Sequence, residues 1–195
     1  AVVSINYRLS QEAIFPAQIF DCKSALRFVK AHAGEYKLDK ERIGLWGGSA
    51  GGHLAALLAT SEGVADLEDF STGNAEENTR VRAVVVWYGP TYSFLEMDAM
   101  LAETGNGPSD HSLPESPESC LLGAQITQVP ELVWKASPAA YITSAAPYFL
   151  LQHGYHDPVV PVRQTIKSAA AIDKTAGKGK VHLDVLENHV MHADP

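Results

Sequence analysis

The sequence is poor in cysteine and in positive charge, and it contains no long apolar run. Its only two cysteines, Cys22 and Cys120, stand at no zinc-ligand spacing. They form either one disulfide or two thiols, of which the thiols are favoured, and the cellular compartment stays open. Lys and Arg total 15 against 23 Asp and Glu, a net charge of −8 that argues against nucleic acid as a partner. No apolar run reaches the roughly 18–20 residues of a membrane-spanning helix, so no membrane partner is expected.

The composition is that of an ordinary folded domain. Hydrophobic residues make up 46% of the 195 residues and charged residues 19%, which excludes a disordered chain. This length suits one domain with a proper core, and we predict a single domain over residues 1–195. The chain begins at Ala1, inside an apolar segment, with neither Met nor a signal peptide. We therefore expect a processed chain or a part of a longer protein.

Short apolar runs alternate with helical patterns along the chain. Strands are predicted at residues 2–6, 43–46, 81–88, 148–153 and 181–186. Helices are predicted at residues 16–32, 52–60 and 162–175. The apolar runs lack polar alternation, which is typical of strands that are buried on both faces. The sequence therefore predicts an α/β protein, with a mostly parallel sheet and helices on both faces.

Residues 92–146 interrupt this alternation. The segment is rich in Pro, Ser, Gly and Glu and has only weak helical pieces. A long irregular connection is unusual in a compact domain unless it serves the site, so we interpret it as an inserted cap or pocket wall. Four aromatic residues stand near its start, at Trp87, Tyr88, Tyr92 and Phe94. They suit a wall for a small or aromatic acyl group, or else they are ordinary core and surface aromatics.

The strongest signal for function is a G-x-S-x-G motif centred on Ser49, between a predicted strand and a predicted helix. This context is that of a nucleophile elbow, a sharp turn that exposes the Oγ of the serine. The residues two before and two after the serine must be small, and Gly47 and Gly51 meet that need. The N–H of Ala50, at the helix start, is placed to donate to an oxyanion. A phosphate-binding turn is the weaker alternative, because the motif lacks the Lys of a P-loop.

A serine nucleophile needs a base that a third group orients. In a fold with this elbow the acid and then the histidine follow the serine along the chain. Asp157 comes just after a late predicted strand, whereas Asp173 and Asp184 are weaker candidates inside a helix and a strand. The last predicted strand leads to His189 and His192, which position alone does not separate.

The spacing of the histidines also suggests a metal site, which is a less favoured alternative. Two H-x-x-H pairs are formed by His153 with His156 and by His189 with His192. Neither pair sits on a clear helix, where i, i+4 spacing would be expected for a shared ion. His53 opens the helix after the elbow and is predicted to be structural.

Longer stretches resemble the α/β-hydrolase esterases of the hormone-sensitive-lipase and acetyl/feruloyl-esterase-like branch. The elbow region, IGLWGGSAGGHLAALLAT at residues 43–60, carries the most specific resemblance. Further similar stretches cover nearly the whole chain: VSINYRLS at 3–10, FPAQIFDCKSALRFVK at 15–30, ESCLLG at 118–123, ASPAAYI at 136–142 and HGYHDPVVPV at 153–162. HADP at residues 192–195 resembles the catalytic-histidine motif of the family and favours His192 over His189.

The resemblance implies an α/β-hydrolase fold and a triad of Ser49, Asp157 and His192. It implies a serine carboxylic-ester hydrolase that works through an acyl-enzyme and needs no cofactor. The expected substrates are short-chain or aromatic acyl esters, including acetyl or feruloyl groups on plant polysaccharide. Two alternatives stay open: a peptidase or formamidase on the same fold, and a catalytically silent binding module.

The sequence departs from the family pattern at both ends. Family members carry an H-G-G-G-type motif before the strand that matches residues 2–6, and its N–H groups supply the other half of the oxyanion hole. That motif, the first strands of the sheet and the helix after the histidine have no counterpart here. We therefore expect a fold truncated at both ends, with residues 2–6 as an unpaired apolar edge. A homo-oligomer or a further part of a longer protein would cover that edge.

Overall fold

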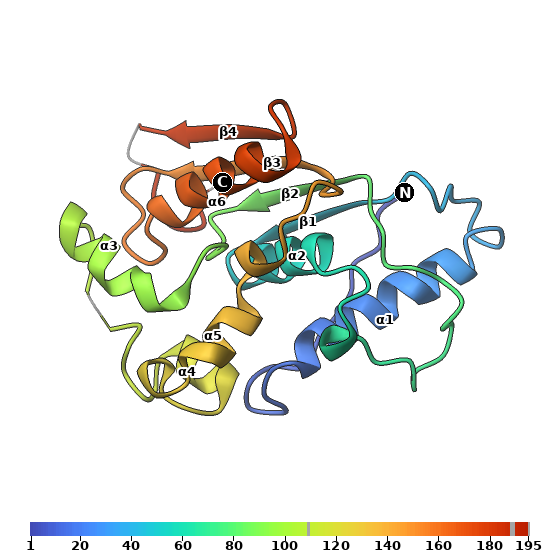
Figure 1. Ribbon diagram of the computed structural model, residues 1–195, viewed down its shortest axis with the longest axis horizontal. Coiled ribbons are helices and arrows are strands. Elements are labelled where there is room, and N and C mark those ends of the chain that lie inside the picture. Colours follow the sequence, from blue (N-terminus) through green and yellow to red (C-terminus); the bar gives the residue numbers. More distant parts are fainter. Residues whose placement is uncertain (109, 188–189, 195) are drawn as a thin grey trace.

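The computed structural model describes residues 1–108, 110–187 and 190–194. Among these residues, four parallel strands form one sheet in the order β1-β2-β3-β4 (Figure 1). The strands are β1 (Gly44–Gly48), β2 (Ala83–Trp87), β3 (Tyr148–Gly154) and β4 (Val181–Leu186). Because all four run the same way, their carboxyl ends meet at one edge of the sheet, and the loops that leave this edge lie close together.

Helices connect the strands and fill the segment between β2 and β3. They are α1 (Ala17–Ala31), α2 (Ala50–Thr60), α3 (Met97–Thr104), α4 (Pro117–Leu122), α5 (Pro130–Ala136) and α6 (Arg163–Ala176). Short 3₁₀ turns lie at η1 (Ala65–Leu67), η2 (Phe94–Glu96), η3 (Ile126–Gln128) and η4 (Pro138–Tyr141). Apart from residues 2–6, each predicted strand and helix is present, with ends within two residues of its predicted bounds. The predicted α/β class and the parallel sheet are confirmed.

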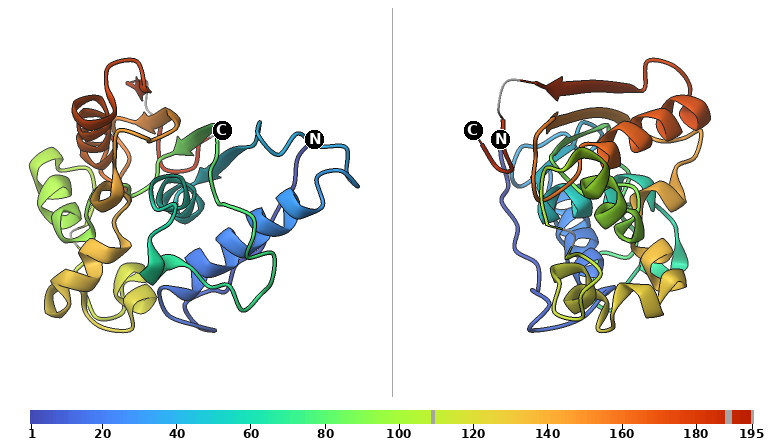
Figure 2. Two further views of the ribbon diagram at one scale, coloured as in Figure 1. Left: turned by 45° about the vertical axis from the view of Figure 1, so that its right-hand side comes forward. Right: turned by 90° about the vertical axis from the view of Figure 1, so that its left-hand side faces the viewer.

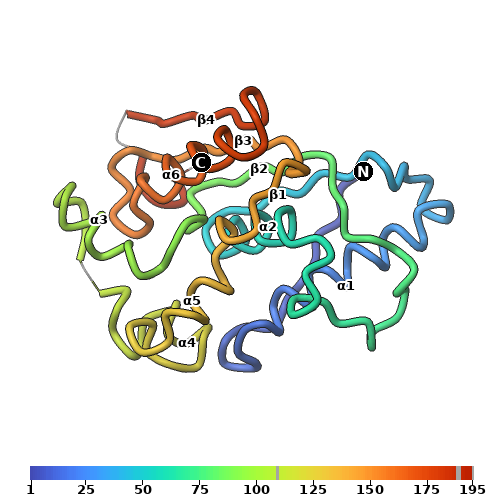
Figure 3. Tube along the Cα trace, in the orientation of Figure 1, coloured from blue at the N-terminus to red at the C-terminus, as the bar shows by residue number. Residues whose placement is uncertain are grey.

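Residues 2–6 are not a strand, and this part of the prediction is wrong. The chain start runs to the loop before α1 without joining the sheet, as Figure 3 traces in blue. A strand needs a hydrogen-bonded neighbour, and none of the described residues pairs with this segment, so Val2 is 93% exposed. Among the described residues, the outer strands of the sheet are β1 and β4 instead. A cavity of about 710 Å³ lies between the chain start and β1. Val3 and Ile5 line it from the chain start, and Leu45 and Trp46 line it from β1.

The helices that contact the sheet lie on one face of it (Figure 2). Their apolar side chains form a single cluster with the strands, whose members are Ala56 and Ala59 of α2, Ala169 and Ile172 of α6, and Val84, Val86, Phe149 and Leu151 of the sheet. On the opposite face Trp46 is 65% exposed and Tyr148 51% exposed. Among the described residues, therefore, one of the two expected helical layers is present.

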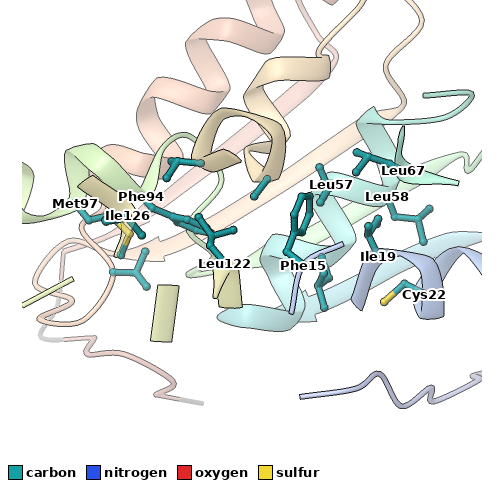
Figure 4. Close-up of a cluster of buried hydrophobic side chains, with 14 of the residues drawn as sticks. Phe15, Ile19, Cys22, Leu57, Leu58, Leu67, Phe94, Met97, Leu122 and Ile126 are labelled. Carbon is teal, nitrogen blue, oxygen red and sulfur yellow. The ribbon is translucent and has the colours of Figure 1, made fainter. Parts of the chain in front are cut away.

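Residues 92–146 pack against the helices instead of forming an irregular loop. Phe94, Met97, Leu122 and Ile126 from this segment are buried in one cluster with Ile19 of α1 and Leu57 of α2 (Figure 4). This packing fixes the segment beside α2, the helix that directly follows Ser49.

Two further expectations from the sequence concern the cysteines and membrane-spanning helices. Cys22 is buried and Cys120 is exposed, and both are free thiols. None of the helices in the described part of the chain has the length and apolar content needed to cross a bilayer.

Candidate active site

Ser49 occupies a sharp turn between β1 and α2. Its backbone has φ 51° and ψ −122°, a conformation that a residue with a side chain rarely adopts. The turn is held on both sides, because the N–H of Ser49 donates to the Trp87 carbonyl at 2.9 Å and its carbonyl accepts from the His53 N–H at 2.9 Å. The strained backbone is the geometry expected of a nucleophile elbow.

Gly47 is needed for this turn because the backbone of the following helix approaches it closely. A Cβ at Gly47 would lie 2.2 Å from the Gly51 carbonyl oxygen, far inside van der Waals contact. The prediction that Gly51 must be small for the same reason is not met, since a Cβ there would find no atom within 4 Å. Gly51 instead borders the cavity between residues 1–7 and β1.

Asp157 lies in the loop that follows β3 and is buried, with 1% of its surface exposed. Its Oδ1 accepts the N–H groups of Val159 at 2.8 Å and Val160 at 2.9 Å. Its Oδ2 lies 2.8 Å from His192 Nδ1 and 3.2 Å from His153 Nε2. Two backbone and two side-chain donors therefore surround one carboxylate.

These donors hold Asp157 in its ionised form. Burial alone would raise the pKa of this carboxyl, but hydrogen bonds from His153, His192 and the two backbone N–H groups outweigh it. The pKa of Asp157 consequently lies well below its ordinary value, and the carboxylate is charged at neutral pH.

His192 joins Asp157 to Ser49. Its Nε2 lies 2.9 Å from Ser49 Oγ, and its Nδ1 faces Asp157 Oδ2, so the three side chains form one continuous hydrogen-bonded chain. The segment before His192 reaches this place because Gly154 lacks a side chain: a Cβ there would lie 2.1 Å from the Val190 carbonyl oxygen. His189, the other candidate base, lies outside the described residues.

The N–H of Ala50 is the donor that the structure places beside Ser49. Ala50 is the first residue of α2 and is exposed. The first N–H groups of a helix have no intrahelical acceptor, and they lie at the positive end of the helix dipole. This N–H is therefore free to meet a negative oxygen on a group bound at Ser49.

The aromatic residues predicted to wall the site separate in the structure. Tyr88 packs edge-on against the His192 imidazole, with ring centroids 4.9 Å apart. Phe94 is 3% exposed and packs on His53 in the core, and Trp87 donates from Nε1 to Gln152 on the sheet. Tyr92 lies beneath the Lys167 ammonium. Of the four aromatic rings, that of Tyr88 packs on a triad side chain, whereas Trp87 contacts Ser49 through its backbone carbonyl.

The remaining candidates take other roles. Asp184 accepts from the Gln152 amide and pairs with His182, and Asp173 is exposed on α6. His53 is buried, donates from Nε2 to the Ala136 carbonyl at 2.7 Å, and has a pKa lowered by burial. The structural role predicted for it agrees with these contacts. Among the described residues, no group of three or more His, Cys, Asp or Glu side chains is arranged to hold a metal ion.

Two histidines beside the triad were not predicted to serve it, since His153 was considered only in an H-x-x-H pair for a metal and His111 had no motif around it. His153 contacts Asp157 directly and is buried. His111 lies in the segment between α3 and α4, and its Nε2 donates to the Val159 carbonyl at 2.8 Å, two residues after Asp157. A further sequence signal for His153 was its place four residues before Asp157, whereas His111 had none.

Several known proteins that are similar to this chain are named as esterases or ester hydrolases. A family model described as BD-FAE matches residues 1–172. The probable carboxylic ester hydrolase LipM of Mycobacterium tuberculosis is 35% identical over 162 residues, which cover 83% of this chain and 35% of LipM.

Two solved structures extend the comparison. A truncated form of a carbohydrate esterase from gut microbiota has a TM-score of 0.82 and 32% identity, covering 93% of this chain and 64% of that one. The acetyl ester-xyloside bifunctional hydrolase from Caldicellulosiruptor lactoaceticus has a TM-score of 0.72 and 29% identity. The match covers 96% of this chain and 61% of that one. The chain thus spans about a third of the length of LipM and less than two thirds of either solved chain.

Proposed function

Because the chain belongs to the BD-FAE family, we propose that it is a serine carboxylic-ester hydrolase with Ser49 as nucleophile, His192 as general base and Asp157 as the orienting carboxylate. Its α/β-hydrolase fold is confirmed by the likeness to the solved esterases. The observation that carries the proposal is the continuous hydrogen-bonded chain from Ser49 Oγ through His192 to Asp157 Oδ2. A hydroxyl is a weak nucleophile, and this arrangement is what activates it.

The reaction follows from these contacts in two halves. Ser49 Oγ attacks the ester carbonyl carbon while its proton passes to His192 Nε2. The tetrahedral intermediate then collapses, the C–O bond to the alcohol breaks, and His192 returns the proton to the leaving oxygen. Water attacks the acyl-enzyme by the same route and releases the acid and free Ser49. Asp157 remains ionised throughout, keeps the imidazole in the tautomer that accepts at Nε2, and stabilises the imidazolium that forms.

Negative charge develops on the carbonyl oxygen in both halves. We assign the Ala50 N–H as a donor to this oxyanion, since it lies next to Ser49 at the N-terminus of α2. Tyr88 packs edge-on against the His192 imidazole. Its ring limits the directions in which the imidazole can turn.

We propose short-chain or aromatic acyl esters as substrates, with acetyl or feruloyl groups on plant polysaccharide as the natural class. The similar proteins support this class through their names, one a carbohydrate esterase and the other an acetyl ester-xyloside hydrolase. Ser49 is partly exposed at the end of the sheet, so an acyl group on a bulky carbohydrate can reach it.

We further propose that residues 1–195 form a single domain in which residues 92–146 are the inserted wall of the pocket. Burial of Phe94 and Leu122 in the cluster shared with α1 and α2 supports this organisation. The free edge at β1, where Trp46 is 65% exposed, supports a homo-oligomer formed through the sheet edge. Light scattering with the wild type and Trp46→Lys tests the second point, because a charge at the edge should leave only monomer.

An activity-based probe and a substrate panel test the proposed chemistry. A fluorophosphonate should label the wild type at Ser49 and leave Ser49→Ala unlabelled. Acetyl, butyryl, longer acyl and feruloyl esters are then compared with matched anilides and formamides. Preference for the amide substrates would indicate a peptidase or formamidase. A folded protein that neither labels nor turns over any substrate would be a silent binding module.

A further inference from the structure

His153 is a buried histidine directly behind Asp157. It lies on β3, and only 1% of its surface is exposed. Its Nε2 is 2.9 Å from the Val160 carbonyl oxygen and 3.2 Å from Asp157 Oδ2, and its Nδ1 is 2.6 Å from Thr165 Oγ1. Both ring nitrogens therefore have polar partners inside the protein, on the loop that carries Asp157 and on α6.

The partners of His153 decide which nitrogen carries a proton. The Val160 carbonyl and the Asp157 carboxylate can only accept hydrogen bonds, and both face Nε2. If Nε2 carried no proton, its lone pair would face two buried oxygen atoms and repel them, and neither oxygen would receive a hydrogen bond from it. The Thr165 hydroxyl can donate to Nδ1, which satisfies the second nitrogen. The geometry therefore assigns the proton to Nε2.

The Asp157 carboxylate depends on its donors for its orientation. The terminal torsion of an aspartate is broad, so no rotamer preference holds Oδ2 in one place. Two backbone N–H groups hold Oδ1, while Oδ2 lies between His192 and His153. The donor on the far side from His192 consequently settles where Oδ2 rests.

We propose that His153 is a positioning residue of the triad, which holds Asp157 Oδ2 toward His192 by donating from Nε2 to that oxygen and to the Val160 carbonyl. The inference rests on the proposed function, because His153 acts only through Asp157 and His192. It does not touch the substrate, since it is buried beneath the carboxylate. Its loss should therefore lower kcat and leave KM unchanged.

A matched pair of variants isolates the hydrogen bond. In His153→Gln the amide nitrogen stands as many bonds from Cβ as Nε2 does and can still donate. His153→Met has nearly the same shape as the Gln variant and carries a methyl group in place of that donor. We expect Met to lower kcat by about tenfold to hundredfold, the rate equivalent of one hydrogen bond to a charged group. Gln should recover most of this loss.

The pH profile supplies a readout that a purely structural role would not move. Among described residues in contact with His192, Asp157 and Tyr88 carry ionisable groups, and His153 faces Asp157 from β3. A carboxylate held toward His192 stabilises the His192 imidazolium. Without the His153 donor, Oδ2 is no longer held there and this stabilisation weakens. The acid limb of kcat/KM should accordingly move to lower pH in His153→Met and stay near the wild-type position in His153→Gln.

The outcomes separate this inference from the function on which it rests. If the intact wild type neither labels with fluorophosphonate nor hydrolyses esters, the proposed function fails first. If the wild type is active and a folded His153→Met keeps its kcat and pH profile, His153 is not a positioning residue. Nitrogen-15 NMR of the wild-type imidazoles decides the matter even where variants fold poorly. A protonated Nε2 on His153 at neutral pH supports the assignment, and a bare Nε2 overturns it.

Discussion

Ser49 Oγ and His192 Nε2 lie 2.9 Å apart although 143 positions separate the two residues. The order of the parallel sheet explains how they meet. Ser49 follows β1, Asp157 follows β3 and His192 follows β4, so all three leave the carboxyl edge of the same sheet. This edge is where open α/β sheets commonly bind their ligands. The side chains are thus brought together by strand order rather than by proximity in the chain.

The first prediction concerns the proposed nucleophile. Ser49→Ala should abolish ester hydrolysis, with kcat lower by roughly 10⁶, because residual catalysis in a serine hydrolase without its serine comes from binding and oxyanion stabilisation alone. Steady-state assays with an acetyl ester measure the effect. Ser144→Ala, at an exposed position, is the matched control and should retain wild-type activity. Near-normal turnover by Ser49→Ala would remove Ser49 from the mechanism.

The site residues that sequence could predict belong to local patterns. The elbow around Ser49 is a strand, a glycine-rich turn and a helix in sequence, so its context is readable from neighbouring residues. Asp157 was placed by the strand before it, and His192 was preferred over His189 only through the family resemblance. The structure joins Ser49, Asp157 and His192 by hydrogen bonds, while their catalytic roles stay predictions.

What sequence could not predict depends on contacts between distant segments. His111 reaches the Val159 carbonyl across 48 positions, and no local pattern marks that approach. Phe94 is an aromatic residue of the kind that can line a pocket. It is buried instead, because α5 and α2 pack around it. Residues 2–6 have the composition of a strand and lack the hydrogen-bonded neighbour that a strand requires. Secondary-structure propensity is a property of one segment by itself. Strand pairing, side-chain burial and long-range hydrogen bonds depend instead on which other segments pack against it.

The second prediction concerns the backbone of the elbow. Gly47→Ala would bring a Cβ to 2.2 Å from the Gly51 carbonyl oxygen, so the turn must shift. We expect the free energy of unfolding to fall by at least about 1–3 kcal/mol, as in overpacked cores, and ester hydrolysis to be lost with it. Gly34→Ala is the control, because a Cβ there meets no atom within 4 Å. Chemical denaturation of both variants gives the comparison, and equal stabilities would contradict the close approach.

The third prediction concerns the acid dependence of stability. The pKa of Asp157 is lowered in the folded protein, so its contribution is fully present above the unfolded value of about 4 and is lost as pH falls toward the folded value. The difference in unfolding free energy between wild type and Asp157→Asn should therefore be constant from about pH 5 to 7 and shrink below about pH 4. The same variant should lower kcat by about 10⁴, because the imidazole loses its productive tautomer. A stability difference that grows on acidification would give the wrong sign.

The last prediction concerns the ion pair that ties residues 92–146 to the loop of Asp157. His111 Nδ1 lies 3.1 Å from Glu118 Oε2, with side chains 7% and 11% exposed, and its Nε2 donates to the Val159 carbonyl. Burial would lower the pKa of His111, but Glu118, the Val159 carbonyl and the Asp98 carboxylate together raise it. A raised pKa means that the pair stabilises the fold fully below the unfolded value of about 6.5 and loses this effect as pH rises through the folded value.

A double-mutant cycle measures this pair directly. The coupling between His111→Gln and Glu118→Gln should be about 1–3 kcal/mol at pH 6 and distinctly smaller at pH 9, where the imidazole is neutral. The exposed pair of Lys135 and Asp66 is the control, because both groups keep their charges over this range and an exposed pair contributes less than about 1 kcal/mol. Equal coupling for His111 and Glu118 at both pH values would mean that the charge of His111 does not change between pH 6 and pH 9. In that case the attachment of the segment to the Asp157 loop would not depend on pH.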